Sequence, residues 1–270
     1  MAIEKVKQAL DAARAAQESG GRSPRGFGAR RRSVETGPID YHTTRSVDVD
    51  TKQLAANRLL MQSADLAALN AYRVLRTQVL KRLGARKWSL IGVTSPTPED
   101  GKSLTASNLA ISLSREAKHT ALLVDLDLVN PSLHKLFGLE PELGVTDYLT
   151  RDDIELSDVL VNPAMDGLVI LPGREKVSDA SEMLSTPKVV DLLVELQRRY
   201  DNRVVICDLP PVLGGDSVIS VAPSLDCLLF VIREGKTREQ DAELALEMIG
   251  DTPLIGSVLN GSEESSNLYY

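Results

Sequence analysis

The 270-residue sequence has few cysteines, histidines and aromatic residues, and each shortage excludes a class of protein. Its 2 cysteines, Cys207 and Cys227, lie in separate apolar runs, so no disulfide framework exists and both thiols are expected to be buried and reduced. The 3 histidines, His42, His119 and His134, lack metal-ligand spacing, so no zinc site is predicted. Aromatic residues make up 4% of the chain, so aliphatic side chains must form the core.

Long uncharged hydrophobic runs and net positive charge are also absent. No apolar run approaches the roughly 20 residues needed to cross a bilayer, and the charged N-terminal segment is unlike a signal peptide. We therefore expect a cytoplasmic protein that reaches the inner face of the cell membrane only through a partner. The 31 basic and 38 acidic residues give a net charge of −7, which disfavours nucleic-acid binding by the whole surface.

The first 50 residues differ from the rest in composition. Residues 1–18 place Ile3, Val6 and Leu10 at helical spacing, which predicts a short amphipathic helix. Residues 19–50 are predicted to be a flexible linker, because glycine, serine, proline and arginine dominate its first half without an acidic residue. This basic linker is either a solvated tether or a patch for anionic lipid headgroups or an acidic partner.

Residues 51–262 are predicted to form a single α/β domain. Residues 51–83 have a helical pattern in two pieces that meet near residues 63–64, with Gly84 as the C-cap. Continuous apolar runs then alternate with helical stretches, and Thr237 with Gln240 predicts a capping box for the last helix. Because continuous runs indicate strands buried on both faces, we expect a doubly wound, mainly parallel sheet. The runs are Trp88–Thr94, Ala121–Leu128, Leu168–Leu171, Val204–Cys207, Cys227–Ile232 and Leu254–Leu259.

The first apolar run is followed by a phosphate-binding pattern. Gly101, Lys102 and Ser103 match the end of a P-loop, in which backbone N–H groups and a helix N-terminus hold phosphates and the serine can ligate Mg²⁺. The leading glycine position of the motif holds Pro96 instead. The nucleotide-binding residues predicted from this loop are Asp100, Gly101, Lys102, Ser103 and Leu104.

Acidic residues end two of the other predicted strands. Asp125 and Asp127 lie two residues apart, hence on one face, and Asp208 precedes two prolines at the end of another run. The carboxyl ends of parallel strands share one edge of a sheet, so these acids should lie beside the P-loop. Together with Lys102 they predict a site for Mg²⁺ and a nucleotide.

This order of motifs resembles the bacterial tyrosine kinases of polysaccharide synthesis, whose P-loop fold is shared with the MinD/ParA ATPases. The resemblance covers about residues 66–260, and the N-terminal segment looks like that of soluble autokinases associated with exopolysaccharide and exosortase gene sets. MinD-like proteins carry an extra lysine early in the P-loop, and Pro96–Asp100 contains none, which favours a kinase.

The resemblance implies a role for each site residue. Lys102 would bind the phosphates of ATP, and Asp125 would accept the proton of the tyrosine. The resemblance also implies that Ser103, Asp127 and Asp208 form the Mg²⁺ shell, and it places Asn260 near the adenine. The terminal Tyr269 and Tyr270, in the tail 263–270, would be the phospho-acceptors.

The resemblance further implies partners and raises two alternatives. A membrane polysaccharide co-polymerase would activate the kinase, a cognate tyrosine phosphatase would reverse it, and the helix carrying Arg73 and Arg76 would support a homo-oligomer. Asn70 replaces an acid of the oligomerisation motif, and Val129–Asn130 replace arginines common in the family. The first alternative is a nucleotide-switch ATPase of the MinD/ParA-like superfamily without tyrosine kinase activity. The second is a non-catalytic ATP-binding adaptor of polysaccharide export.

Overall fold

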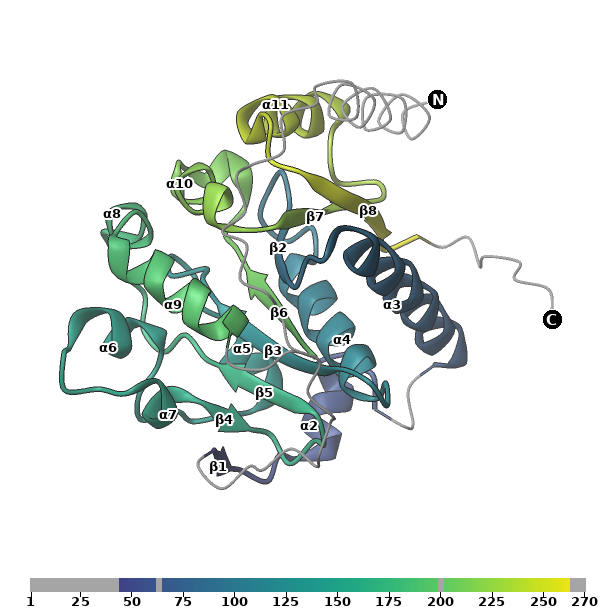
Figure 1. The fold of residues 1–270 in the computed structure, drawn as a ribbon. Coiled ribbons are helices and arrows are strands. Elements are labelled where there is room, and N and C mark those ends of the chain that lie inside the picture. The colour runs from purple at the N-terminus through teal and green to yellow at the C-terminus, as the bar shows by residue number, and fades with distance from the viewer. Residues whose placement is uncertain (1–43, 62–64, 199–201, 263–270) are drawn as a thin grey trace.

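The computed structural model describes residues 44–61, 65–198 and 202–262, which form one sheet with helices on both faces (Figure 1). Its strands are β1 (Arg45–Ser46), β2 (Leu90–Thr94), β3 (Thr120–Asp125), β4 (Val161–Asn162), β5 (Leu168–Leu171), β6 (Arg203–Asp208), β7 (Cys227–Arg233) and β8 (Leu254–Asn260). Their order in the sheet is β1-β4-β5-β3-β6-β2-β7-β8. The predicted helix 1–18, most of the linker 19–50 and the tail 263–270 with Tyr269 and Tyr270 lie outside the described residues.

Neighbouring strands pair in parallel throughout this sheet except β4 and β5, which are antiparallel. The predicted doubly wound, mainly parallel α/β fold is therefore confirmed. The sequence does not predict β1 and β4, because a strand of 2 residues leaves no recognisable apolar run. Since β1 lies within the predicted linker 19–50, the sheet starts before residue 51.

The helices form two layers. They are α2 (Thr51–Ala56), α3 (Leu66–Arg86), α4 (Lys102–Ser114), α5 (Leu133–Phe137), α6 (Val145–Thr150), α7 (Leu156–Val159), α8 (Ala180–Leu184), α9 (Pro187–Arg198), α10 (Ser217–Val221) and α11 (Glu239–Ile249). Helices α2–α5 cover one face of the sheet and α6–α11 the other, each over its own hydrophobic core. None of the described helices is long and apolar enough to cross a membrane.

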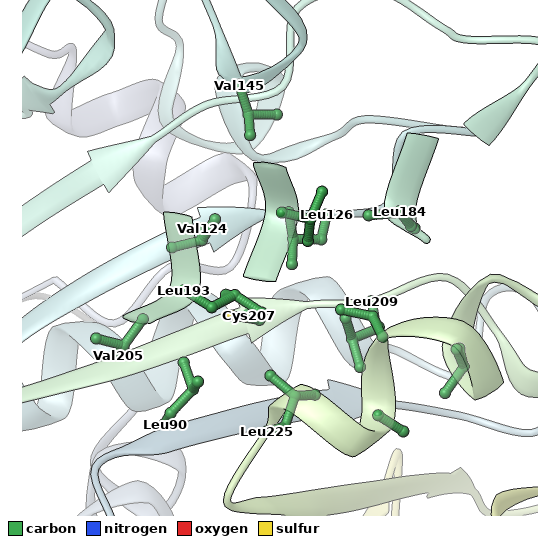
Figure 2. Close-up of a cluster of buried hydrophobic side chains, with 14 of the residues drawn as sticks. Leu90, Val124, Leu126, Val145, Leu184, Leu193, Val205, Cys207, Leu209 and Leu225 are labelled. Carbon is green, nitrogen blue, oxygen red and sulfur yellow. The ribbon is translucent and has the colours of Figure 1, made fainter. Parts of the chain in front are cut away.

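Side chains alternate between the two faces along the strands, so the longer strands contribute residues to both hydrophobic cores. In β3, Leu122 and Val124 enter the core beneath α6–α11, while Leu123 enters the core beneath α2–α5. Figure 2 shows part of the first core, where Val124 and Cys207 of adjacent strands lie near Leu193 of α9. Strands β2, β3, β5 and β6 are buried at every residue, whereas β8 at the sheet edge is only partly buried.

The two cysteines lie in this buried part of the sheet. Both thiols are free and buried, and burial raises the pKa of each above its usual range. The prediction of buried thiols is therefore confirmed.

The helix caps predicted from the sequence are wrong at α3 and α11. Gly84 is not a C-cap, because α3 continues to Arg86 and ends at Lys87, which has a left-handed φ of 59°. The guanidinium of Arg86 stacks over the Trp88 ring, 4.7 Å from its centroid, beside this end. Leu66, the first residue of α3, is 65% exposed. The predicted capping box is also wrong, since the N-cap of α11 is Arg238 and no side chain caps it.

Candidate active site

The P-loop joins β2 to α4 in the predicted strand, loop and helix order. The helix begins at Lys102, so Lys102, Ser103 and Leu104 form its first turn. Gly101 is the N-cap, with a left-handed φ of 95°, and no side chain caps the helix. The first backbone N–H groups of a helix have no partner inside it, and together with the helix dipole they favour an anion. This geometry suits a phosphate group.

Lys102 connects the P-loop to the acidic strand ends. Its Nζ lies 2.6 Å from Asp127 Oδ2 and 3.6 Å from Asp208 Oδ1, and it donates to Ser103 Oγ at 3.1 Å. Burial by itself would lower the pKa of Lys102, but the charges of Asp208 and Asp127 outweigh burial and raise it. The side chain is therefore a buried cation held by two carboxylates.

Asp125 lies at the end of β3, directly opposite Asp208 of β6 in the strand register. It is fully buried, and its Oδ2 accepts the backbone N–H groups of Ser132 and Leu133, each at 3.0 Å. Its Oδ1 has no hydrogen-bond partner among the described residues. Burial, followed by the charge of Asp208, raises the pKa of Asp125 to about 7. A carboxylate with one oxygen fixed and one open is suited to accept a proton.

The other two acids have different surroundings. Asp127 Oδ1 accepts the backbone N–H of Asn130 at 3.0 Å, so Asp127 is tied both to the next turn and to Lys102. Asp208 is fully buried. Its Oδ1 forms an ion pair with Lys102 Nζ at 3.6 Å, and neither of its oxygens makes a hydrogen bond within the part of the chain that the structure describes. Burial raises the pKa of Asp208 to about 6, although Lys102 and Ser103 oppose the rise. Two strand ends thus hold three buried acids around one buried lysine.

This excess of buried carboxylate fits a divalent cation. Asp208 and Ser103 offer oxygen ligands, and the open oxygens of Asp208 are the kind of orphaned polar atoms that a bound ion satisfies. Within residues 44–61, 65–198 and 202–262, no three acidic, histidine or cysteine side chains form a ready metal cluster. Mg²⁺ commonly uses only one or two carboxylates, with phosphate oxygens and water completing its shell. The residues present therefore suit Mg²⁺ that arrives with a nucleotide.

Two further predicted residues hold the P-loop itself. The Asp100 side chain is fully buried and accepts the backbone N–H and hydroxyl of Thr97, at 3.0 and 2.9 Å. Asn260, at the end of β8, donates its Nδ2 to the backbone carbonyl of Asp100 at 2.9 Å. Gly101 permits this approach, because a Cβ there would lie 1.9 Å from Asn260 Nδ2. Contact between Asn260 and adenine stays a prediction.

Several residues that contact the site were not predicted from the sequence. Arg233 and Lys236, at and after the end of β7, contact the P-loop, and Thr237 donates its hydroxyl to Asp100. Gly173, after β5, packs so closely that a Cβ would lie 3.1 Å from Asp125 Cγ. All four follow strand ends, so extending the strand-end rule from acids to every polar or small residue would have found them.

The structure also locates the departures from the family pattern. Asn70 Oδ1 accepts from Arg73 at 3.2 Å within α3, and Arg76 donates to the carbonyl of Ser112 in α4 at 2.9 Å. Arg76 therefore fastens α3 to α4. Val129 is 51% exposed in the turn that starts at Asp127, so an uncharged side chain stands where the family pattern has an arginine.

Comparison with known proteins agrees with this geometry. No family model matches the chain. The chain is 30% identical over 213 residues to the tyrosine-protein kinase ptk of Acinetobacter johnsonii, covering 78% of this chain but 28% of ptk. It is 30% identical over 201 residues to the tyrosine-protein kinase YwqD of Bacillus subtilis, covering 74% of this chain and 83% of YwqD. A putative tyrosine-protein kinase in the cps region of Klebsiella pneumoniae is 27% identical over 209 residues, covering 76% of this chain and 28% of that protein.

Solved structures share the fold. The VpsO kinase domain superposes with a TM-score of 0.62 at 29% identity, covering 72% of this chain and 95% of that one. The kinase domain of the Escherichia coli tyrosine kinase ETK gives 0.68 at 23% identity, covering 84% and 91%. MinD of Pyrococcus horikoshii gives 0.53 at 23% identity, covering 65% and 72%, which extends the likeness of fold to P-loop ATPases. With YwqD matched over most of its length, the chain belongs to the family of bacterial tyrosine-protein kinases.

Proposed function

We propose that the protein is a Mg-ATP-dependent tyrosine autokinase that phosphorylates Tyr269 and Tyr270 and regulates the synthesis and export of an exopolysaccharide or capsule. The observation that carries the kinase proposal is Asp125, a buried carboxylate with one open oxygen beside the P-loop lysine. The names of the relatives support the reaction, and the cps-region kinase supports the link to polysaccharide.

Phosphoryl transfer depends mainly on positioning and charge neutralisation, and the site residues can provide both. Lys102 would release Asp127 and bind the phosphates, while the first turn of α4 donates backbone N–H groups to them. Asp125 would accept the proton of the attacking tyrosine hydroxyl. Ser103, Asp127 and Asp208 would hold Mg²⁺, which when bound neutralises phosphate charge.

The tyrosines in the described part of the chain are poorly placed to be phospho-acceptors, which supports an acceptor in another part of the chain. The Tyr72 hydroxyl is buried beside Thr105 and Asn108, and burial raises its pKa. Tyr148 is half-buried in α6, and Lys188 Nζ lies 5.7 Å from its ring centroid. A tyrosine that is phosphorylated by a neighbouring subunit must reach the active site of that subunit. Tyr269 and Tyr270, in the tail 263–270, are the proposed acceptors.

The partners follow from the same proposal. A membrane polysaccharide co-polymerase would bring the protein to the inner face of the cell membrane and activate it, and a cognate phosphatase would remove the phosphate. A homo-oligomer through the Arg73 and Arg76 helix would present one tail to the neighbouring site. Arg73 lies on an exposed part of α3, whereas Arg76 is already bonded to α4.

The decisive test is phosphotyrosine formation by the purified full chain with Mg-ATP, alone and with the cytoplasmic tail of a co-encoded membrane partner. We expect a signal that Lys102→Ala abolishes and that Tyr269→Phe/Tyr270→Phe removes. ATP hydrolysis without phosphotyrosine under every condition would contradict the kinase proposal and favour the switch ATPase. Nucleotide binding with neither reaction would favour the adaptor.

A further inference from the structure

The P-loop is held from outside by three residues at the end of β7 and in the turn that follows. We define Arg233, Lys236 and Thr237 as the β7 clamp. We infer that the β7 clamp positions the phosphate-binding loop, so that nucleotide affinity depends on side chains that do not themselves touch the reacting atoms. This inference rests on the proposed nucleotide-binding function of the P-loop.

The backbone of the P-loop is strained at Glu99. Glu99 has a φ of 64°, a left-handed conformation that costs free energy for any residue with a Cβ and persists only where its surroundings enforce it. Arg233 donates to the Glu99 carbonyl at 3.0 Å. Lys236 Nζ donates to the Pro98 carbonyl at 3.0 Å and to Glu99 Oε2 at 2.8 Å. The clamp therefore holds the strained residue through its carbonyl, its side chain and the carbonyl before it.

Thr237 also fixes Asp100, the residue between Glu99 and the N-cap of α4. Thr237 Oγ1 donates to Asp100 Oδ1 at 2.9 Å and accepts the backbone N–H of Arg233 at 2.7 Å. Because Asp100 is fully buried, its two oxygens depend on the donors that Thr97 and Thr237 supply. Removing the Thr237 hydroxyl would leave a buried carboxylate oxygen unpaired and would free the segment that precedes Gly101.

These hydrogen bonds fix the chain just before the first turn of α4. Asn260 donates to the Asp100 carbonyl, so β7 and β8 both hold the residue that precedes the N-cap of α4. The direction of the α4 N–H groups is set at this point of the chain. Thr237 and Lys236 are therefore positioning residues, and Thr237 is the more consequential because its partner is buried.

The test compares Thr237→Val with Thr237→Ser, which keeps the hydroxyl. A matched control is Thr186→Val, because the Thr186 hydroxyl donates to the Met183 carbonyl just before α9, away from the P-loop. The dissociation constant of a non-hydrolysable ATP analogue with Mg²⁺ would be measured on the full chain, at a temperature where melting curves show every variant folded. We expect about tenfold weaker binding for Thr237→Val, and binding within about twofold of wild type for Thr237→Ser and the control.

A double-mutant cycle tests the strain argument separately. In the wild-type chain, Lys236→Met should weaken analogue binding about threefold, the scale of an exposed ion pair. In a Glu99→Gly background the same change should have a smaller effect, because glycine adopts the left-handed φ freely and lacks the carboxylate, so that only the contact of Lys236 Nζ with the Pro98 carbonyl is lost. Equal effects in both backgrounds would contradict the strain argument.

The outcomes separate this inference from the proposed function. If the wild-type chain binds no analogue, both are overturned. If the wild type binds and Thr237→Val binds equally well, or if Thr237→Val lowers only the melting temperature, the β7 clamp is a structural contact and the positioning inference is wrong.

Discussion

The two sides of the active site differ in how completely their buried polar groups are paired. On the β7 and β8 side, the Asp100 carboxylate and carbonyl accept hydrogen bonds from Thr97, Thr237 and Asn260. On the β3 and β6 side, one oxygen of Asp125 and both oxygens of Asp208 make no hydrogen bond with the described residues, although both side chains are fully buried and Lys102 Nζ lies 3.6 Å from Asp208 Oδ1. Buried groups without partners are costly and mark places where a ligand completes the structure. The β7 and β8 side, which we call the paired side, therefore keeps its structure without a ligand. The β3 and β6 side, which we call the unpaired side, is suited to bind a charged ligand.

The largest expected effect comes from removing the cation that the unpaired side already has. Lys102→Ala should lower phosphotyrosine formation by about 10³-fold or more, because phosphate charge is no longer neutralised in the transition state. It should also lower the free energy of unfolding by about 3–5 kcal/mol, since it leaves buried acids without their partner. Kinase assays and denaturant titration measure the two effects. Lys188→Ala, which removes an exposed partner of Asp152, is the control and should change neither.

Asp125→Asn separates chemistry from binding on the same side. Losing the proton acceptor should reduce phosphotransfer about 10²-fold or more while leaving analogue binding within about threefold of wild type. The variant should also change the pH dependence of stability. Because the pKa of Asp125 is raised to about 7, the folded state binds more protons than the unfolded state between the ordinary and raised pKa values, and stability falls as pH rises through that window.

We therefore expect Asp125→Asn to flatten this fall, so that the variant gains stability relative to wild type at pH 8. Melting curves between pH 5 and pH 8, spanning about the raised pKa, would measure it. An unchanged pH profile would show that the Asp125 carboxylate is not destabilised by its surroundings.

Charge delivered by a ligand should stabilise the unpaired side. Mg²⁺ with ADP at about one hundred times its dissociation constant should raise the melting temperature by roughly 5–10 °C. EDTA should remove most of the rise. Asp208→Asn should reduce the Mg²⁺-dependent part, whereas Asp152→Asn on the exposed surface should not. A rise of the same size with and without Mg²⁺ would contradict the assignment of the acids to the metal.

The smallest expected effect comes from adding a charge at the edge of the unpaired side. Val129→Arg places a guanidinium at an exposed position after the Asp127 turn, and phosphotransfer should rise about two- to threefold at low salt. Val74→Arg, at a position 39% exposed on α3, is the matched control and should leave the rate unchanged. A loss of the gain at high salt would identify the cause as electrostatic.

The unpaired side could be predicted from the sequence because its signals are local. Lys102, Asp125 and Asp208 each end or follow a continuous apolar run, and parallel pairing brings such ends to one edge. The paired side could not be predicted in the same way. Thr237 and Asp100 are 137 residues apart, and the threonine also fits a helix-capping pattern, which misdirected its interpretation.

The strained backbone of Glu99 and the short strands β1 and β4 could not be predicted from the sequence either. Glutamate has no preference for a left-handed φ, so nothing in its residue type marks Glu99 as the strained position. The two-residue strands β1 and β4 depend on tertiary pairing with their neighbours and not on their own composition.

The buried thiols give the sheet an internal reporter of opening. Cys207 precedes Asp208 in β6, Cys227 begins β7, and β2 with its P-loop lies between these strands. A thiol reagent can reach either sulfur only when the surrounding strands separate, so the labelling rate measures local unfolding. Both cysteines flank β2, the strand that precedes the P-loop. Slower labelling on addition of nucleotide would therefore show that ligand binding reduces local unfolding at the centre of the sheet. The measurement uses the natural cysteines and needs no introduced label.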